Sequence, residues 1–490
     1  MATIRGRRKQ QKQRSRARRV RVGEPDPRLT KAAGLEAVRE LDRVLGLTST
    51  LDAHVGALKQ RNRGVTGGQL LLSMASAQLA GEDHLVGLDR RRADTAGQAL
   101  EPVPTPVSTT AAGVAKRFTP QHLRQVEQAM GAVNTEWVSR LPATRRGVLL
   151  KTATIDGDTT DVEVYGPTKD DAAHAYTGAL TLRGHIGFWA EAGVPLAGEV
   201  MGGTEDPRAN VAEMLDRSIA ALPAGVEAIR CRWDAGYFAA ELAKACLERG
   251  VEFAIGAKRT KPLMSAAQRV PDHAWVPAIG MENTEVAIVE YLPGTWPTGA
   301  GITCVARRTR IPAGQVPTGR ARRRRTIPVE QLELALEGRI DAVYGYSFFL
   351  TNLDLGDPDN EDADDQTEQA EKLAEVEWWY RHRTDIEALN RDAKHGAALR
   401  HLPSADRRVN QVWLWAALLA CAISAWTQEL ADLDRGNGRG RRTIARFRRE
   451  LIATPARLTR RGGALLLRLP PGDQLLATVL PRLQQLPNPG

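Results

Sequence analysis

The sequence of 490 residues is 42% hydrophobic and 26% charged, a composition typical of a globular protein with room for two to four domains. Its four cysteines form no CxxC pair and no cluster with histidine, which excludes a disulfide framework or zinc site and favours a reducing, cytoplasmic setting. The most apolar run, residues 412–426, has 15 residues and falls short of the ~20 needed to span a bilayer. We therefore expect a buried core helix there and no contact with a membrane.

The formal net charge of +10 is concentrated at the N-terminus. Residues 1–22 contain ten Lys or Arg and no acid, and without these ten the 68 basic residues would equal the 58 acidic ones. No apolar stretch follows, so this is not a secretory signal. We predict a disordered basic arm over residues 1–28 that binds a polyanion, most simply a nucleic acid.

Residues 29–145 show apolar residues at helical spacing, broken by Gly and Pro, and predict a mostly helical region. A small helical DNA-binding domain is one interpretation of this region, and an all-helical scaffold is the other. No unambiguous helix-turn-helix motif is present.

Residues 146–257 change character, with strand-like segments in the order β-β-β-α-β-α-β. Alternating strands and helices predict an α/β sheet with some parallel pairing. Four further strand-like runs over residues 258–354, with a basic loop at 319–328, predict a β-rich insertion. The acidic stretch 355–371 lacks the glycine and ligand spacing of a calcium loop and is expected to be a linker. Helices are expected over 372–432, followed by a basic region over 433–490.

Carboxylates occur where two of these strands are expected to end. Asp156 and Asp158 occur at the end of the first strand, and Asp234 ends the fourth. Strand ends converge at one edge of an α/β sheet, where ligands commonly bind. With a third carboxylate from a packed helix, they would form the oxygen-rich site that Mg²⁺ prefers, and two such ions can support phosphodiester cleavage. Either residue of the Asp156 and Asp158 pair can be the first ligand, since both lie on the same side of an extended strand.

The stretch WWYRHRTDIEALNRDAKHG, residues 378–396, predicts one continuous helix. At about 100° per residue, Arg383, Glu387 and Lys394 fall within about 60° of Tyr380, on one helix face. The alternative is a solvated face with an i,i+4 pair between Arg383 and Glu387. Asn390 and Arg391 lie near the same face and are weaker candidates for contacts with DNA.

Together these features resemble the DDE transposases with an RNase H-like core. Tyr380, Arg383, Glu387 and Lys394 match the YREK signature of bacterial cut-and-paste insertion-sequence transposases. Asp158-Thr159-Thr160 resembles the first-strand Asp-x-Thr motif, and Asp234-Ala235-Gly236-Tyr237 resembles the second motif. The resemblance covers roughly residues 146–430, and it favours Asp158 over Asp156 as the first ligand.

The resemblance implies roles for these residues. Asp158, Asp234 and Glu387 would be the catalytic metal ligands, holding two ions of Mg²⁺, or of Mn²⁺ as a substitute. Tyr380, Arg383 and Lys394 would hold the DNA near the cleaved strand, which suits the planar fork of Arg and the point charge of Lys.

The function that this implies is cleavage at the terminal inverted repeats of an insertion sequence and joining of the 3′ ends to target DNA. The partners would be double-stranded DNA and a second copy of the chain in a synaptic homodimer, in the cytoplasm at the nucleoid. The arm, the basic loop 319–328 and Arg-rich 439–449 would add phosphate contacts. Two alternatives are a DNA-binding regulator without catalysis and an RNase H-like nuclease without strand transfer.

Overall fold

A computed structural model describes residues 20–59, 64–175, 178–316, 326–356, 363–434, 441–472 and 474–489, with the backbone alone at 363–365. Most of the basic arm, most of the basic loop 319–328 and the first residues of the Arg-rich segment lie outside these ranges.

The N-terminal region is helical, as its apolar spacing predicts. After a short strand, β1 (Leu29–Thr30), it contains α2 (Leu35–Leu45), α3 (Leu47–Val55), α4 (Gly67–Leu79), α5 (Gly87–Ala93), α6 (Thr95–Gln98), α7 (Ser108–Ala115), α8 (Pro120–Ser139) and α9 (Ala143–Lys151). Thr66 and Thr119 form capping boxes at the starts of α4 and α8, which satisfy amide groups that a helix start would leave unpaired.

The predicted β-β-β-α-β-α-β order is confirmed. It consists of β2 (Thr152–Glu163), β4 (Leu180–Trp189), β5 (Val194–Gly202), α10 (Val211–Ala220), β6 (Ala228–Trp233), α11 (Ala240–Glu248) and β7 (Glu252–Gly256), with a two-residue β3 (Ala173–His174) added. The strands lie in the order β5-β4-β2-β6-β7. β2 pairs parallel to β6 and β6 parallel to β7, whereas β2, β4 and β5 pair antiparallel.

The expected start and end of the first strand were wrong. Residues 146–151 belong to α9, and β2 then runs unbroken for 12 residues through both aspartates. Asp156 and Asp158 therefore lie in the middle of a strand and not at its end. β2 outlasts β6, whose ladder with it ends at Gly157 and Trp233, so Asp158 still lies where the parallel pairing stops.

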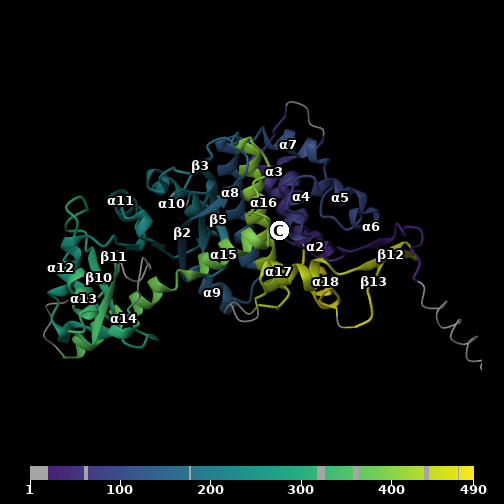
Figure 1. Ribbon diagram of the computed structural model, residues 1–490. Helices are drawn as coiled ribbons and strands as arrows, with labels where there is room; N and C mark the ends of the chain where they lie inside the picture. The colour runs from purple at the N-terminus through teal and green to yellow at the C-terminus, as the bar shows by residue number, and fades with distance from the viewer. Residues whose placement is uncertain are drawn as a thin grey trace, which may run out of the picture.

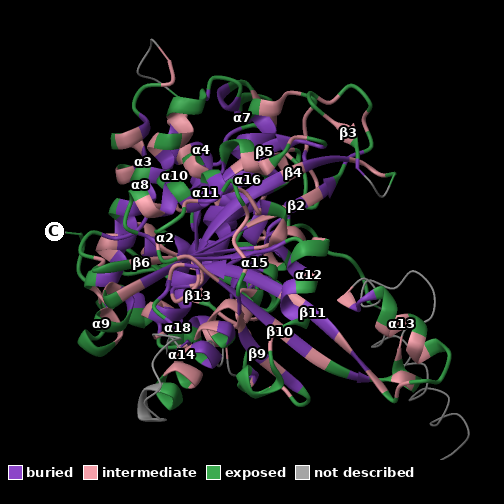
Figure 2. Cartoon of the chain, turned by 90° about the vertical axis from the view of Figure 1, so that its left-hand side faces the viewer, coloured by how far each residue is buried: buried purple, intermediate pink, exposed green. Residues whose placement is uncertain are grey.

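The four strands expected over 258–354 are present and extend the same sheet. They are β8 (Val276–Pro277), β9 (Thr284–Val289), β10 (Thr303–Pro312) and β11 (Ala342–Thr351), accompanied by α12 (Lys261–Gln268) and α13 (Val329–Leu336). β11 pairs antiparallel with β7, so the sheet continues as β7-β11-β10-β9-β8. Figure 2 shows β10 and β11 reaching away from the buried centre of the molecule toward α13.

The helices after the sheet differ from expectation at two points. α14 (Ala363–Arg381) begins inside the segment expected to be a linker, whose residues 357–362 are not described. The single helix expected through residues 378–396 is wrong, because α14 ends at Arg381 and α15 (Thr384–His395) begins after it. At the break the amide of Arg383 bonds to the carbonyl of Tyr380 at 3.3 Å, an i→i−3 bond. Thr384 and Asp385 are typical of a helix start, which explains the interruption.

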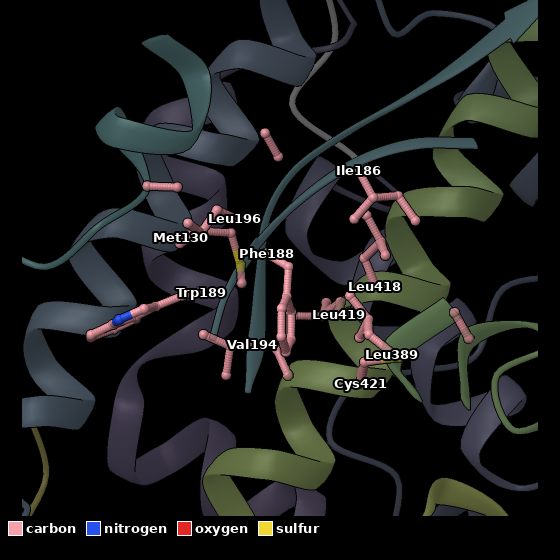
Figure 3. Close-up of a cluster of buried hydrophobic side chains, with 14 of the residues drawn as sticks. Met130, Ile186, Phe188, Trp189, Val194, Leu196, Leu389, Leu418, Leu419 and Cys421 are labelled. Carbon is pink, nitrogen blue, oxygen red and sulfur yellow. The ribbon is translucent and has the colours of Figure 1, made fainter. Parts of the chain in front are cut away.

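The apolar run 412–426 lies in α16 (Arg407–Leu430), which is long and apolar enough to cross a membrane by length and composition. Its apolar window is fully buried inside the molecule, as expected for a core helix. Figure 3 shows how β4 divides the surrounding core. Ile186 and Phe188 face Leu418 and Leu419 of α16, whereas Trp189 lies on the other side toward Met130 of α8.

The C-terminal region packs against the N-terminal helices. It comprises α17 (Ile444–Phe447), a π-helical turn (Arg448–Ile452), β12 (Ala456–Arg461), β13 (Ala464–Arg468) and α18 (Leu475–Gln485). β1 pairs with β12 in a three-stranded sheet, and α18 lies against α2 (Figure 1). One hydrophobic cluster includes residues from Ala32 to Leu483, so the boundary expected at residue 145 does not separate two cores.

Candidate active site

The register of two parallel strands places Asp158 beside Asp234. Gly157 of β2 is the partner of Trp233 in β6. Asp158 is the next residue of β2, and Asp234 directly follows the end of β6. Both are half-buried. The Asp234 carboxylate accepts a hydrogen bond from the amide of Gly236 at 2.8 Å, which caps the short helix that follows. The two carboxylates thus meet at the end of the parallel pairing, as the strand positions predict.

Gly157 leaves room for the ring of Trp233 from the neighbouring strand. A Cβ atom at this position would lie 1.8 Å from the indole ring of Trp233. Trp233 in turn packs against Tyr237, with ring centroids 4.8 Å apart, and Tyr237 stacks on His185 at 5.6 Å. Burial, together with the nearby charges of Asp158 and Asp234, raises the pKa of Tyr237 well above its ordinary value. The three aromatic rings therefore form a packed cluster beside the two aspartates.

Asp156 has a different environment from Asp158. It is completely buried, and its two oxygens accept from Nε and Nη2 of Arg232 at 2.6 and 2.8 Å. Arg232, its register partner on β6, also bonds to the carbonyl of Trp379 at the end of α14. Burial raises the pKa of Asp156, and Arg232 opposes that shift. The carboxylate of Asp156 thus uses both oxygens to hold Arg232, and Arg232 connects the sheet to the end of α14.

Asp158 instead faces α15. Its Oδ2 accepts from the amide nitrogen of Asn390 at 2.9 Å, and its Oδ1 lies 4.0 Å from Nη1 of Arg383. Burial raises the pKa of Asp158 to about 6. Arg383 lowers it, whereas Asp234 and Glu387 raise it further. The charges of the other two predicted ligands therefore both act on Asp158.

Tyr380 lies at the end of α14 over the end of β7. Its hydroxyl approaches the carbonyl of Trp233 at 3.4 Å, and its ring stacks on Phe349 with centroids 4.5 Å apart. A Cβ at Gly256 would lie 2.5 Å from this hydroxyl, so only glycine leaves room for it. Burial raises the pKa of Tyr380 to about 12, which keeps the hydroxyl protonated as a donor.

Arg383 occupies the helix break and points into the acidic group. Burial disfavours its charge, but Asp158, Tyr380, Asp234 and Asp156 together raise its pKa. Its Nη1 is buried without a hydrogen-bond partner. The guanidinium thus lies among the carboxylates, which the helical wheel did not predict.

Glu387 and Lys394 both lie on α15, in its first and last turns. Glu387 is exposed. Lys394 donates from Nζ to the carbonyl of Asp161 at 2.6 Å, and burial lowers its pKa. Lys394 and Asn390 therefore fix α15 to β2, and Glu387 stands on the same helix as these two contacts.

The donor set at this edge suits a hard cation. Asp158 and Asp234 supply carboxylate oxygens, and the amide oxygen of Asn390 is buried beside them without a partner. Within the described ranges, however, no three His, Cys, Asp or Glu side chains lie close enough together to hold a metal ion. In this conformation the Glu387 carboxylate does not lie close enough to Asp158 and Asp234 to share a metal ion with them.

Two contributors were missed or undervalued by sequence reasoning. Arg232 precedes Asp234 by two residues, and its register partnership with Asp156 could be found only by aligning the two strands. Asn390 was a weak candidate from its helical position, yet it is the residue that bonds to Asp158.

Comparisons with known proteins place the chain in a family. Among solved structures it is similar to the synaptic complex of piggyBac transposase with hairpin DNA, at 10% identity and a TM-score of 0.40, over 85% of this chain and 79% of that one. No curated protein matches it. The family model for transposase DDE domain group 1 matches residues 12–320, which is more than half of the chain and includes Asp158 and Asp234 but not Glu387. The chain therefore belongs to the family of group 1 transposase DDE domains.

Proposed function

We propose that this transposase binds the terminal inverted repeats of an insertion sequence, cuts DNA at the element ends and joins the 3′ ends to target DNA. The observation that carries the proposal is the placement of Asp158 and Asp234 on adjacent parallel strands under α15, which bears Glu387. The strand order β5-β4-β2-β6-β7 supports an RNase H-like core.

Asp158, Asp234 and Glu387 would hold divalent cations, Mg²⁺ or Mn²⁺. When bound, these would supply Lewis-acid activation of water and stabilisation of a leaving 3′ oxygen. The orphan oxygen of Asn390 supports this assignment, because a buried amide oxygen beside a carboxylate suits a hard cation. Asp156 is a poorer ligand than Asp158, since its oxygens are engaged by Arg232.

The remaining signature residues would position the DNA strand. Arg383 carries a buried donor without a partner, which a phosphate oxygen would satisfy. Lys394 and Tyr380 surround the same carboxylates, although their polar atoms bond to backbone carbonyls in this conformation. Two element ends must be held at once for transposition, so we propose that the active assembly is a homodimer on double-stranded DNA.

The test uses the full chain, Mg²⁺ and a labelled duplex that carries the element's own end. Wild type should nick the end and join it to a target duplex. Glu387→Gln should bind the duplex and do neither, because the substitution removes a ligand charge and keeps the side-chain volume. Asp385→Asn, two residues away on the same helix and also exposed, is the matched control and should retain both reactions.

Other outcomes would favour the alternatives. Binding without cutting by wild type, in Mg²⁺ and in Mn²⁺, would indicate a DNA-binding regulator. Cutting without a joined product would indicate a nuclease without strand transfer.

A further inference from the structure

An exposed β-ribbon projects from the C-terminal region. β12 and β13 pair antiparallel from Arg457 with Arg468 to Arg461 with Ala464. The connecting glycines, Gly462 and Gly463, have φ values of 57° and 83°, which glycine adopts without strain. The N-terminal strand β1 pairs with the other edge of β12 (Figure 1).

The register gives this ribbon two different faces. On the inner face, Leu458 and Leu467 are partners, are half-buried and pack against the main core. Arg460 and Leu465 of that face are exposed at the tip. The outer face carries three exposed arginines: Arg457, Arg461 and Arg468. The pattern therefore packs Leu458 and Leu467 against the core on one side and presents three arginines on the other, beside the exposed Leu466.

The cations of the outer face are not neutralised within the ribbon. Arg457 and Arg468 are direct cross-strand partners, and like charges in that position destabilise a sheet. Residues 451–472 contain no acid. Arg457 lies 3.1 Å from Asp26, which Arg28 shares at 2.9 Å. For Arg461 and Arg468, no acidic partner is found within the described part of the chain. An anion lying across this face would reduce the repulsion between these arginines.

We propose that the outer face of the β12–β13 ribbon binds the phosphate backbone of a DNA duplex. This rests on the proposed function, in which DNA is the substrate. A two-stranded β-ribbon fits the major groove of B-DNA, and arginine forks match phosphate oxygens. We infer a polyanionic partner because three exposed arginines lie on this face and no acid lies among them. The ribbon also adjoins the segment that leads into residues 1–22 with their ten basic residues.

The experiment measures duplex binding by the full chain as a function of salt. The test variant is Arg461→Gln with Arg468→Gln, which leaves the Arg457 pair with Asp26 intact. Each lost phosphate contact reduces the slope of log K against log salt by about 0.9, so we expect a reduction of about 1.8 with weaker binding at low salt. The effect should be the same for the element's end and for an unrelated duplex, since phosphates carry no sequence information.

The matched control removes the same charge elsewhere. Arg269→Gln with Arg339→Gln alters two exposed arginines beside α12 and α13, at the opposite end of the molecule (Figure 1). If the ribbon variant and this control have the same DNA affinity and the same slope of log K against log salt, the proposal is overturned. Unchanged DNA binding with loss of the dimer, measured by sedimentation, would also overturn it and would assign the ribbon to a second copy of the chain.

The two proposals fail separately. If the ribbon variant keeps full affinity while Glu387→Gln still abolishes cutting, only the ribbon proposal is lost. If wild type binds through the ribbon but never cuts, the ribbon proposal stands and the catalytic one is lost. Coincident thermal unfolding of the variant and wild type excludes misfolding as the cause of weak binding.

Discussion

The guanidinium of Arg383 faces the carboxylate of Asp158, with Nη1 4.0 Å from Oδ1. This nitrogen is buried and has no hydrogen-bond partner. The charges of Asp158 and Asp234 help to raise the pKa of Arg383, although burial acts against it. Arg383 thus places a positive charge beside the carboxylates that would bind the proposed metal ions. It also has a free N–H donor that a DNA phosphate could accept.

We predict that Arg383→Ala binds Mn²⁺ more tightly than wild type when DNA is absent. The substitution removes a cation that competes for Asp158, and partly buried pairs of this kind contribute about 1 kcal/mol, or roughly fivefold in affinity. Isothermal titration calorimetry of the full chain with Mn²⁺ measures the difference. The same variant should cut the element end more slowly because it has lost a phosphate contact.

Arg383→Lys is the matched control, since it keeps the positive charge without the planar fork. It should resemble wild type in Mn²⁺ affinity more closely than Arg383→Ala does. Equal or weaker Mn²⁺ binding by Arg383→Ala would show that the guanidinium does not compete with the cation.

Asp158 should make stability depend on pH. Burial raises its pKa from 3.8 in the reference state to about 6. The folded state then binds more protons than the unfolded state between about pH 4 and 6, so stability falls as pH rises through that window. Asp158→Asn should therefore be more stable than wild type at pH 7.5, by on the order of 2 kcal/mol, and equal to it near pH 4.

Urea unfolding across this pH range, in EDTA, gives the comparison. Asn390→Ala removes the amide that donates to Asp158 but leaves the carboxylate, so the fall in stability with rising pH should persist and become steeper, because the lost donor favoured the ionised form. A lower stability of Asp158→Asn at pH 7.5 would contradict the expected cost of ionising this buried group.

Asp156 should contribute to stability far more than its neighbour. Burial raises the pKa of Asp156 as it does that of Asp158, but the two short bonds from Arg232 hold the Asp156 carboxyl ionised. Asp156→Asn therefore leaves Arg232 buried without its charge partner, and breaking such a pair typically costs about 3–5 kcal/mol. The contact from Arg232 to the end of α14 would weaken too. The double variant Asp156→Leu with Arg232→Met should recover much of the loss, because it leaves no unpaired charge. Urea midpoints decide this, and a loss below about 1 kcal/mol for Asp156→Asn would contradict a structural role.

Much of the sheet could be predicted, because its information is local. Strand-like runs and turn residues indicated the order from β2 to β7 and the four strands that follow β7. The start of β2 was misplaced because GVLLK reads equally well as helix or strand from its apolar content. The shared core of the two termini could not be predicted, since the pairing of Leu29 with Arg457 joins positions far apart in sequence.

The sequence proposed residues for the candidate site, but it could not give their geometry. The helical wheel placed Tyr380, Arg383 and Glu387 on one face, but the break after Arg381 turns α15 and sends Arg383 inward. The choice between Asp156 and Asp158 stayed open in the sequence because strand alternation treats them alike. The two aspartates differ only in the folded structure, where Arg232 on β6 binds Asp156 and leaves Asp158 to face α15.

Gly157 should tolerate no side chain, because its added Cβ would overlap the ring of Trp233 at 1.8 Å. Overpacking of this kind typically costs 1–3 kcal/mol, and a shift of Trp233 would also displace the adjacent Asp234. We therefore expect Gly157→Ala to lower both the free energy of unfolding and the rate of end cutting. Gly147→Ala is the control, since nothing lies within 4 Å of its added Cβ and it lies within α9, where alanine should stabilise by about 0.5–1 kcal/mol. Calorimetric unfolding of both variants measures the contrast. If Gly157→Ala is as stable as Gly147→Ala, the ring of Trp233 does not lie tightly over Gly157.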